Sequence, residues 1–304
     1  MLIRRGIAAC RESGPGRAVA IGNFDGLHLG HQAILAELRQ RGRESRLPTA
    51  VVCFEPQPKE FFQPAAAPAR LMRLREKATG IAQAGIYELR VLRFDERLAG
   101  FEPQAFIKRV LTGALGARQV VIGEGFRFGK ARVGDVESLR RAGFSVQAVP
   151  PRLHAGAPVS STRVRAALAA GRLDEARALL GRDYRIGGRV VAGERLGRQL
   201  GFRTANVRLH RRVSPVAGIF AVRVSGGGLD RRDGIASVGT RPTVGGREWL
   251  LEAHVFDYDG DLYGERLEVD FLARLRDELR FESVEAMAAQ MHDDARLARQ
   301  LLAN

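Results

Sequence analysis

Two histidines three residues apart, His28 and His31, lie in a glycine-rich stretch between an apolar run and a helical pattern. Residues 18–21 are typical of a buried strand that breaks at Gly22, and residues 32–39 have apolar side chains at helical spacing. Backbone N–H groups at such a helix start point outward and carry partial positive charge, which favours a bound phosphate. Two imidazoles on one side of the first turn can donate hydrogen bonds to a phosphoryl group.

Two other interpretations of the histidine pair stay open. The imidazoles can belong to surface residues that only cap the turn. They can also bind zinc, although the helical spacing HExxH and an obvious third ligand are both missing from the sequence. Phosphate chemistry is the interpretation that the turn favours.

A second polar group follows the spaced glycines Gly193, Gly197 and Gly201. Thr204 and Asn206 offer oxygen atoms two residues apart, which suits Mg²⁺ held jointly with substrate phosphates. The alternative is that both side chains satisfy the backbone of a turn. The sequence GxxxxGK[ST] is absent, which argues against a P-loop ATPase.

An alternating run at residues 250–256 is typical of a strand with Glu252 and His254 on one face and Leu251, Ala253 and Val255 on the other. A carboxylate that projects from such a strand can take a proton from a hydroxyl nucleophile. The alternative is an ordinary solvated glutamate.

Three more turns carry candidate binding residues. In FEPQP, residues 54–58, the prolines are expected to keep the chain out of a helix. In GEGFRFG, residues 123–129, a phenylalanine replaces the third glycine of GxGxxG, so the two aromatic rings either fill core or stack on a flat ligand. In SSTR, residues 160–163, the hydroxyls either cap the next helix or direct its start at a triphosphate, with Arg163 as a donor.

Alternating strand and helix patterns in the first half predict parallel βαβ units, in which ligands bind beyond the carboxyl ends of the strands. The expected strands are residues 18–21, 49–54, 88–92, 119–122 and 145–149, and the expected helices are 32–39, 73–84, 103–111, 136–142, 164–170 and 173–180. From residue 186, short runs bounded by glycine predict an antiparallel barrel or sandwich, followed by a helix at 283–302. These runs are residues 188–192, 218–224, 234–238, 250–256 and 266–271.

The 304 residues suffice for two domains, and 45% hydrophobic content supports real cores. A net charge of +15 leaves nucleic-acid binding as a secondary hypothesis, because the basic residues are scattered and only four of the 49 are lysines. Cys10 and Cys53 are too few for a disulfide framework. We expect a cytoplasmic protein with no membrane span.

The motifs together resemble one family. GNFDGLHLGH is similar to the HxGH signature of nucleotidyltransferases, in the form carried by bifunctional riboflavin kinase/FAD synthetases. GRQLGFRTAN is similar to the G-x-x-L-G-F-P-T-A-N element of riboflavin kinases, and GTRPTVGG and LEAHVFDYDGDLYGE are similar to the segments that follow it. FEPQP, GEGFRFG and SSTRVR fall in the family's order.

The resemblance implies a fold and a function. It implies an α/β Rossmann-like nucleotidyltransferase domain at residues 1–182, and at residues 183–304 an all-β antiparallel Greek-key barrel with a C-terminal helix. The barrel would convert riboflavin and ATP into FMN and ADP with Mg²⁺, and the other domain would convert FMN and ATP into FAD and pyrophosphate. The sequence does not indicate an oligomeric state. The alternatives are retention of only one activity, or a nucleotidyltransferase for another phosphorylated metabolite.

The resemblance also assigns residues. It makes Glu252 the catalytic base of the kinase, and His28 and His31 the catalytic pair of the adenylyltransferase. Its nucleotide-binding residues would be Gly22, Asn23, Phe24, Asp25, Gly30, Ser160, Ser161, Thr162 and Arg163 in the adenylyltransferase, and Gly193, Gly201, Thr204 and Asn206 in the kinase, the last two also holding Mg²⁺. Phe54, Pro56, Phe126 and Phe128 would bind flavin.

Four residues depart from the family pattern. Gln57 replaces a usual histidine, Ser237 replaces a usual asparagine, and Arg203 replaces the proline of the PTAN element. Gly125 stands where an asparagine or aspartate is common. Gln57 and Gly125 bear on adenylyl transfer, and Arg203 bears on the kinase.

Overall fold

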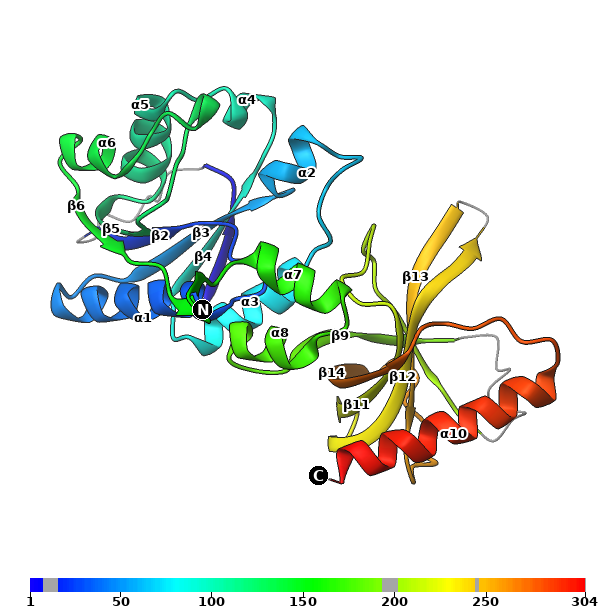
Figure 1. Cartoon of the computed structure of the whole chain (residues 1–304). Helices are drawn as coiled ribbons and strands as arrows, with labels where there is room; N and C mark the ends of the chain where they lie inside the picture. Colours follow the sequence, from blue (N-terminus) through cyan, green and yellow to red (C-terminus); the bar gives the residue numbers. More distant parts are fainter. Residues whose placement is uncertain (8–15, 193–201, 244–245, 304) are drawn as a thin grey trace. The chain divides into compact units, whose positions relative to one another are not determined.

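The computed structural model describes residues 1–7, 16–192, 202–243 and 246–303 (Figure 1). Two compact units divide the chain: an N-terminal unit of Met1–Pro68 and Met72–Ser160, and a C-terminal unit of Ala69–Leu71 and Ser161–Asn304. Helices α7 (Ser161–Ala169) and α8 (Leu173–Leu180) therefore lie in the C-terminal unit. The expected family-domain boundary at residue 182 stays a prediction.

A six-stranded parallel sheet forms the N-terminal unit, in the order β1-β4-β3-β2-β5-β6. The chain runs outward from β2 in both directions, so the carboxyl ends of β2 and β5 mark the point where the strand order reverses, and ligands bind at such points. This confirms the Rossmann-like class. The strands are β1 (Leu2–Arg5), β2 (Arg17–Ile21), β3 (Thr49–Glu55), β4 (Glu88–Arg93), β5 (Ala117–Gly123) and β6 (Ser145–Val149).

Both faces of this sheet are covered, which explains why β2 is apolar from Ala18 to Ile21. Val19 and Ile21 enter one core, and Ala18 and Ala20 enter the other. Helices α1 (Leu29–Glu44) and α3 (Leu74–Gln83) pack on the alanine side (Figure 1). The opposite core receives α5 (Pro103–Phe106), the π-helix η1 (Ile107–Ala114) and α6 (Val136–Arg141). Short elements complete the unit: α2 (Pro58–Phe62), α4 (Glu96–Ala99), η2 (Lys130–Arg132), β7 (Leu153–His154) and β8 (Ala157–Pro158).

One prediction for this unit was wrong, and one strand was missed. The prolines after β3 were expected to prevent a helix, but α2 begins at Pro58. Proline suits this first helical position, because the missing N–H would have no partner within the helix. Strand β1 was not predicted, since its side chains are mostly exposed at the sheet edge and show no hydrophobic alternation.

The C-terminal unit contains a closed antiparallel barrel in the order β10-β13-β12-β11-β14-β9. Strands β11 to β13 pair consecutively and β14 returns beside β11, which is the Greek-key arrangement and confirms the predicted class. Sequence patterns missed β10, which has only four residues. The strands are β9 (Tyr184–Val191), β10 (Ala205–Arg208), β11 (Gly218–Gly226), β12 (Leu229–Thr243), β13 (Gly246–Val255) and β14 (Arg266–Arg276).

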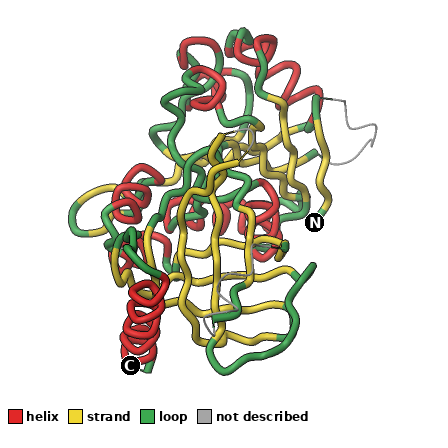
Figure 2. Tube along the Cα trace, turned by 90° about the vertical axis from the view of Figure 1, so that its right-hand side faces the viewer, coloured by secondary structure: helices red, strands yellow, loops and turns green. Residues whose placement is uncertain are grey.

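The C-terminal helix α10 (Val284–Leu302) lies along the barrel in both views (Figures 1 and 2). The Ser283 hydroxyl accepts a hydrogen bond from the Ala286 N–H at 3.1 Å and so begins the helix. Ala298 and Leu302 pack against Phe256 of the barrel unit. Among the described residues, no helix is long and apolar enough to cross a membrane.

Candidate active sites

The two histidines form one stacked pair at the start of α1. Nδ1 of His28, the N-cap residue, accepts a hydrogen bond from the His31 backbone N–H at 3.4 Å. The two rings are stacked with centroids 3.7 Å apart and planes at 21°. A β-carbon on Gly30 would lie 3.2 Å from the His28 ring, so glycine lets this ring fold over the helix start. The pair therefore lies where β2 leads into α1, as predicted.

The loop between β2 and α1 is held tightly. Phe24, Gly26 and Leu27 have positive φ angles of 49°, 85° and 44°. The Asp25 carboxylate accepts a hydrogen bond from the Met72 N–H at 2.9 Å. Phe24 and Asp25 are both buried, so their side chains fix the loop. A bound nucleotide would contact the backbone of this loop, together with Gly22 and the half-buried Asn23. This contact stays a prediction.

The electrostatic surroundings of the two imidazoles favour neutral rings. A backbone N–H must donate, so His28 Nδ1 is the acceptor and its proton lies on Nε2. Burial, followed by the nearby charges of His28 and Lys77, holds the pKa of His31 well below its usual value. Lys77 is fully buried on α3, and its Nζ lies 3.9 Å from Glu55 Oε1. Sequence reasoning missed Lys77, although a lysine three and four residues before Gly80 and Ile81 stands on the apolar face of the predicted helix.

Aromatic rings gather after β3. Phe54 is half-buried and meets Phe94 edge-on, with centroids 5.8 Å apart. Phe62 of α2, which the sequence analysis did not single out, is 63% exposed and meets the same Phe94 ring at 5.6 Å. Pro56 is exposed beside them. These rings offer an apolar surface for a flat ligand.

The other aromatic pair divides between core and surface. Phe128 is buried and packs on Phe106 with centroids 5.5 Å apart, so it serves the core. Phe126 is half-buried and lies nearly parallel to Phe128. Flavin binding by this pair stays a prediction. A β-carbon on the neighbouring Gly125 would meet no atom within 4 Å, so a side chain would fit there.

The predicted phosphate-binding segment 160–163 opens α7. Ser161, Thr162 and Arg163 occupy the first helical turn in the C-terminal unit, whereas Ser160 ends the N-terminal unit. Arg163 Nη2 lies 3.7 Å from Glu175 Oε1 of α8. Binding of a triphosphate by this segment stays a prediction.

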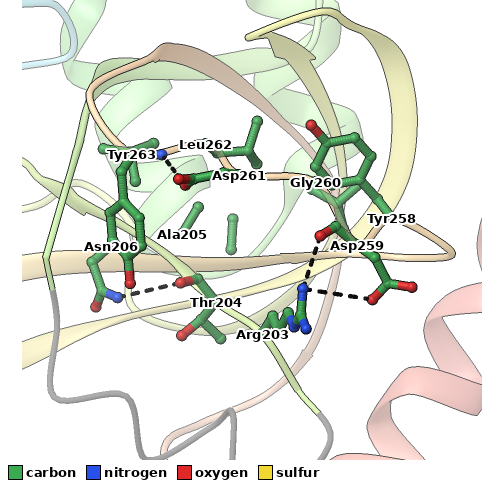
Figure 3. A pocket seen from close by; sticks show the side chains of 13 residues that line it. Arg203, Thr204, Ala205, Asn206, Tyr258, Asp259, Gly260, Asp261, Leu262 and Tyr263 are labelled. Carbon is green, nitrogen blue, oxygen red and sulfur yellow. Dashed lines mark hydrogen bonds and ion pairs between the residues drawn. The ribbon is translucent and has the colours of Figure 1, made fainter.

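A pocket of about 250 Å³ opens in the barrel unit beside Thr204 and Asn206 (Figure 3). The segment 258–263 forms part of its lining, with Tyr263 reaching toward Thr204 and Asn206. The Asn206 amide nitrogen donates to the Thr204 carbonyl oxygen at 3.4 Å. Gly193 and Gly201 lie outside the described residues. Within the part of the chain that is described, no group of three or more His, Cys, Asp or Glu side chains is placed to hold a metal ion.

Strand register pairs the predicted base with a residue of this pocket. Asn206 of β10 lies opposite Glu252 of β13, and Ser237 of β12 lies opposite Glu252 on its other side. Opposite residues of antiparallel strands direct their side chains to the same face. Leu251, Ala253 and Val255 are buried on the other face, as predicted. Glu252 lies outside the pocket lining, to which β13 contributes Ala253 and Val255 of the other face, and Asn206 is the pocket residue that lies opposite Glu252.

The Glu252 carboxylate is 23% exposed and is paired. Arg241 Nη2 donates to Glu252 Oε2 at 2.6 Å, which leaves Oε1 to accept a proton. A second carboxylate, Glu278, occupies the space that a β-carbon on Gly239 would fill. Desolvation and repulsion from Glu252 raise the pKa of Glu278, while Arg241 opposes this shift. Sequence reasoning missed Arg241 and Glu278, because nothing in their spacing relates them to Glu252.

Arg203 fastens the turn in which the resembled family has proline. Its guanidinium Nη1 donates to the Asp259 carbonyl oxygen at 2.8 Å (Figure 3). Its own carbonyl oxygen lies 2.9 Å from His254 Nδ1, which must therefore be the donor. Arg203 thus ties the residues before β10 both to β13 and to the segment 258–263.

One unit has a pair of histidines at a helix start beyond a parallel sheet. The other has candidate oxygen ligands and a carboxylate on a six-stranded barrel. Together these features are typical of a two-unit transferase that acts on phosphate groups. A family model of FAD synthetases matches residues 10–163, and a family model of riboflavin kinases matches residues 180–302. The chain belongs to the family of bifunctional riboflavin kinase/FMN adenylyltransferases.

Individual relatives cover nearly the whole chain. The bifunctional riboflavin kinase/FMN adenylyltransferase of Pseudomonas fluorescens is 46% identical over 310 residues, covering 100% of this chain and 98% of the relative. The protein of the same name from Escherichia coli K12 is 44% identical over 94% of this chain and 92% of its own length. A crystal structure described as a macrolide-efflux protein from Streptococcus pneumoniae shares the fold, with a TM-score of 0.84, 30% identity, and coverage of 98% of this chain and 99% of that one.

Proposed function

We propose that the barrel unit phosphorylates riboflavin with ATP, and that the N-terminal unit then adenylylates FMN with a second ATP. In the first reaction, the ribityl 5′-hydroxyl gives its proton to Glu252 and attacks the γ-phosphorus, releasing ADP. The register pair of Asn206 and Glu252 is the observation that supports this assignment, because the two side chains share one sheet face and Asn206 also lines the pocket. Phosphoryl transfer depends mainly on such positioning.

The residues around Thr204 and Asn206 fit a magnesium ion held jointly with ATP. Magnesium prefers oxygen ligands, and few of them come from protein when phosphates supply the rest. The Asn206 amide nitrogen donates a hydrogen bond to the Thr204 carbonyl oxygen, so the amide oxygen is the atom that can face the ion. Bound Mg²⁺ would neutralise charge on the phosphates. Thr204, Asn206, Gly193 and Gly201 are proposed to orient the nucleotide.

In the second reaction, the FMN phosphate attacks the α-phosphorus of ATP, and pyrophosphate leaves. His28, from Nε2, and His31 would donate to the oxygen on which negative charge develops, together with the N–H groups at the start of α1. Gly22, Asn23, Phe24, Asp25, Gly30, Ser160, Ser161, Thr162 and Arg163 are proposed for the nucleotide, and Phe54, Pro56, Phe126 and Phe128 for the flavin. The exposed Phe62 joins this list, because it meets the same Phe94 ring as Phe54.

One assay tests both reactions: purified protein is incubated with riboflavin, ATP and Mg²⁺, and FMN and FAD are separated by chromatography. Formation of both products is expected. FMN alone would reject the N-terminal assignment, and FAD formed only from added FMN would reject the kinase assignment. If neither product forms and the protein binds RNA in a salt-sensitive way, the nucleic-acid alternative is favoured. If the N-terminal unit adenylylates another phosphorylated metabolite and not FMN, that metabolite is the substrate.

A further inference from the structure

His254 shares a strand face with the proposed base, and the proposed reactions assign it no role. It follows Glu252 by two residues on β13, so both side chains project from the same face of the strand. The imidazole is half-buried and does not line the barrel pocket. A histidine at this position can carry a proton, fill space in the packing, or hold neighbouring residues in place.

The hydrogen bond of Nδ1 argues against the first of these roles. Nδ1 of His254 lies 2.9 Å from the carbonyl oxygen of Arg203, a residue that lines the pocket together with Thr204 (Figure 3). A carbonyl oxygen only accepts, so Nδ1 carries a proton and donates it in the hydrogen bond. This is true of the neutral ring and of the imidazolium alike. Nδ1 is therefore not available to take a proton from a substrate.

This hydrogen bond acts just beyond the point where two strands stop pairing. Strands β10 and β13 pair as far as Ala205 and Ala253, and the next position outward on β13 is His254. Because β10 begins at Ala205, the strand ladder does not hold the backbone of Arg203 and Thr204. The side chain of His254 supplies a bond from β13 to this backbone where main-chain pairing has ended.

The same imidazole also packs against the residue before Arg203. Phe202 is buried, and its ring meets the His254 ring edge-on with centroids 5.0 Å apart. His292 of α10 contacts the Phe202 ring at the same centroid distance, 5.0 Å. His254 therefore holds residues 202 and 203 by one aromatic and one polar contact. The next residue in the chain is Thr204, the first of the two proposed magnesium ligands.

We propose that His254 is a positioning residue of the kinase site, which ties the backbone before Thr204 to the strand that carries Glu252. The proposed nucleotide ligands and the proposed base come from different segments of the barrel unit, so their relative position must be fixed. A donor on β13 that bonds the residue before Thr204 fixes it, and phosphoryl transfer depends on such alignment. The catalytic meaning of this inference rests on the proposed function, whereas the hydrogen bond does not.

Nitrogen NMR of the ¹⁵N-histidine-labelled full-length protein tests the hydrogen bond itself. At pH 8 the spectrum should show Nδ1 of His254 protonated, and the loss of this signal in His254→Asn identifies it. An unprotonated Nδ1 would overturn the inference, whatever the activity of the protein.

Three substitutions separate the hydrogen bond from the packing. His254→Asn keeps a donor, because its amide nitrogen takes the position of Nδ1. His254→Phe keeps a ring against Phe202 without a donor, and the longer amide of His254→Gln places its nitrogen beyond the position of Nδ1. In the phenylalanine and glutamine variants the KM for ATP in FMN formation should rise by about two- to tenfold, the effect of one lost hydrogen bond. The KM for riboflavin should not change, and His254→Asn should restore the KM for ATP.

The matched control is His210→Asn, which removes an exposed histidine of the same unit outside the pocket lining. Asparagine suits the positive φ of 46° at this position, so all kinetic constants should stay at the wild-type values. If His254→Phe fails to fold, His254→Gln still tests the inference with a polar side chain. An unchanged KM for ATP in every folded variant without the donor would overturn the inference. A folded His254→Asn that loses turnover at an unchanged KM would also overturn it, because the ring would then act on a proton.

Binding measurements separate this inference from the proposed function. Calorimetric titration with ADP and Mg²⁺ should give Kd values that rise in His254→Phe and His254→Gln and return in His254→Asn. A wild type that forms FMN while these Kd and KM values stay equal in all variants would reject only the inference. A wild type that forms no FMN, with Nδ1 protonated and the Kd values changing as described, would reject only the proposed reaction.

Discussion

Asn206 and Glu252 lie directly opposite each other on β10 and β13: Asn206 lines the barrel pocket, and Glu252 accepts a hydrogen bond from Arg241 through Oε2. Opposite residues in antiparallel strands have β-carbons about 4.5–5.5 Å apart. In the proposed reaction, a hydroxyl group bound at Asn206 would therefore also be within reach of Glu252.

Replacing Glu252 by glutamine should lower the turnover of riboflavin phosphorylation by about 10²–10⁴-fold, the range typical of a lost general base. The KM for ATP should change little, because Thr204 and Asn206 stay in place. Glu248→Gln is the matched control: it changes a carboxylate four residues earlier on the same strand face, which pairs with Arg208 at 3.7 Å. Unchanged FMN formation by Glu252→Gln would remove it as the base.

The part of the barrel site that could be predicted from the sequence is the part that shows strand periodicity. The alternation around Glu252 gave the buried and exposed faces of β13, because side chains alternate along any strand. The partner of Glu252 could not be predicted, because β10 is too short to show a pattern and register is set by the closed barrel. Arg241 of β12 and Glu278, two residues beyond β14, come near Glu252 only when the barrel folds, and sequence periodicity does not reveal such neighbours.

Replacing His28 by asparagine should separate its two roles. Asparagine is a good N-cap and keeps an acceptor for the His31 N–H, so the thermal midpoint should stay close to wild type. FAD formation from FMN should fall by about 10²–10³-fold, because one donor to the developing charge is lost. His28→Ala should lose both the activity and about 1 kcal/mol of stability.

The control for this experiment is His154→Ala on β7, which removes a histidine elsewhere in the same unit. FMN formation should be unchanged in every histidine variant, since the proposed kinase site lies in the other unit. Normal FAD formation by both His28→Asn and His28→Ala would contradict a catalytic part for this ring.

The low pKa of His31 predicts how stability depends on pH. The unfolded chain binds a proton near pH 6.5 that the folded chain does not, so this contribution is fully present above that pH and is lost as the pH falls through it. The wild-type thermal midpoint should drop by a few degrees between pH 7.5 and pH 5.5 for this reason. His31→Asn should show a smaller drop in the same scans. An equal drop in the two proteins would contradict the neutral ring.

The N-terminal site shows a similar division between what the sequence revealed and what it hid. The glycine turn and the two histidines were predictable, because a strand, a turn and a helix start are local features. Lys77 was hidden, since it is 46 residues from His31 and approaches it only when α3 packs on the same sheet face as α1. Phe128 matched a ligand-stacking pattern but serves the core, which local sequence cannot distinguish.

We expect Arg203 to hold its turn through two hydrogen bonds, to Asp259 and to His254, where the proline of the family pattern would stiffen it. Arg203→Ala removes the hydrogen bond to Asp259 and should raise the KM for ATP by about two- to fivefold, as expected for a contact worth at most about 1 kcal/mol. Arg203→Pro should keep the KM near wild type, because the ring fixes φ and the carbonyl can still accept from His254. Arg232→Ala, which removes a bond to the Asp257 carbonyl outside the pocket lining, is the matched control. Equal KM values in all four proteins would contradict a role for this tie.

Gly125 offers the opposite kind of test, a gain of activity. A β-carbon there would meet nothing within 4 Å, and its φ is not positive, so the backbone and the space both accept a side chain. Gly125→Asn should raise kcat/KM for FMN in FAD formation by about two- to tenfold, the effect of one added hydrogen bond. Gly125→Ala separates this from the loss of glycine's conformational freedom, which stabilises the fold without contacting substrate. A rise in Gly125→Asn alone would mean that an amide acts at this position, an equal rise in both variants would mean that only the backbone was stiffened, and no rise would show that this chain transfers the adenylyl group without help from residue 125.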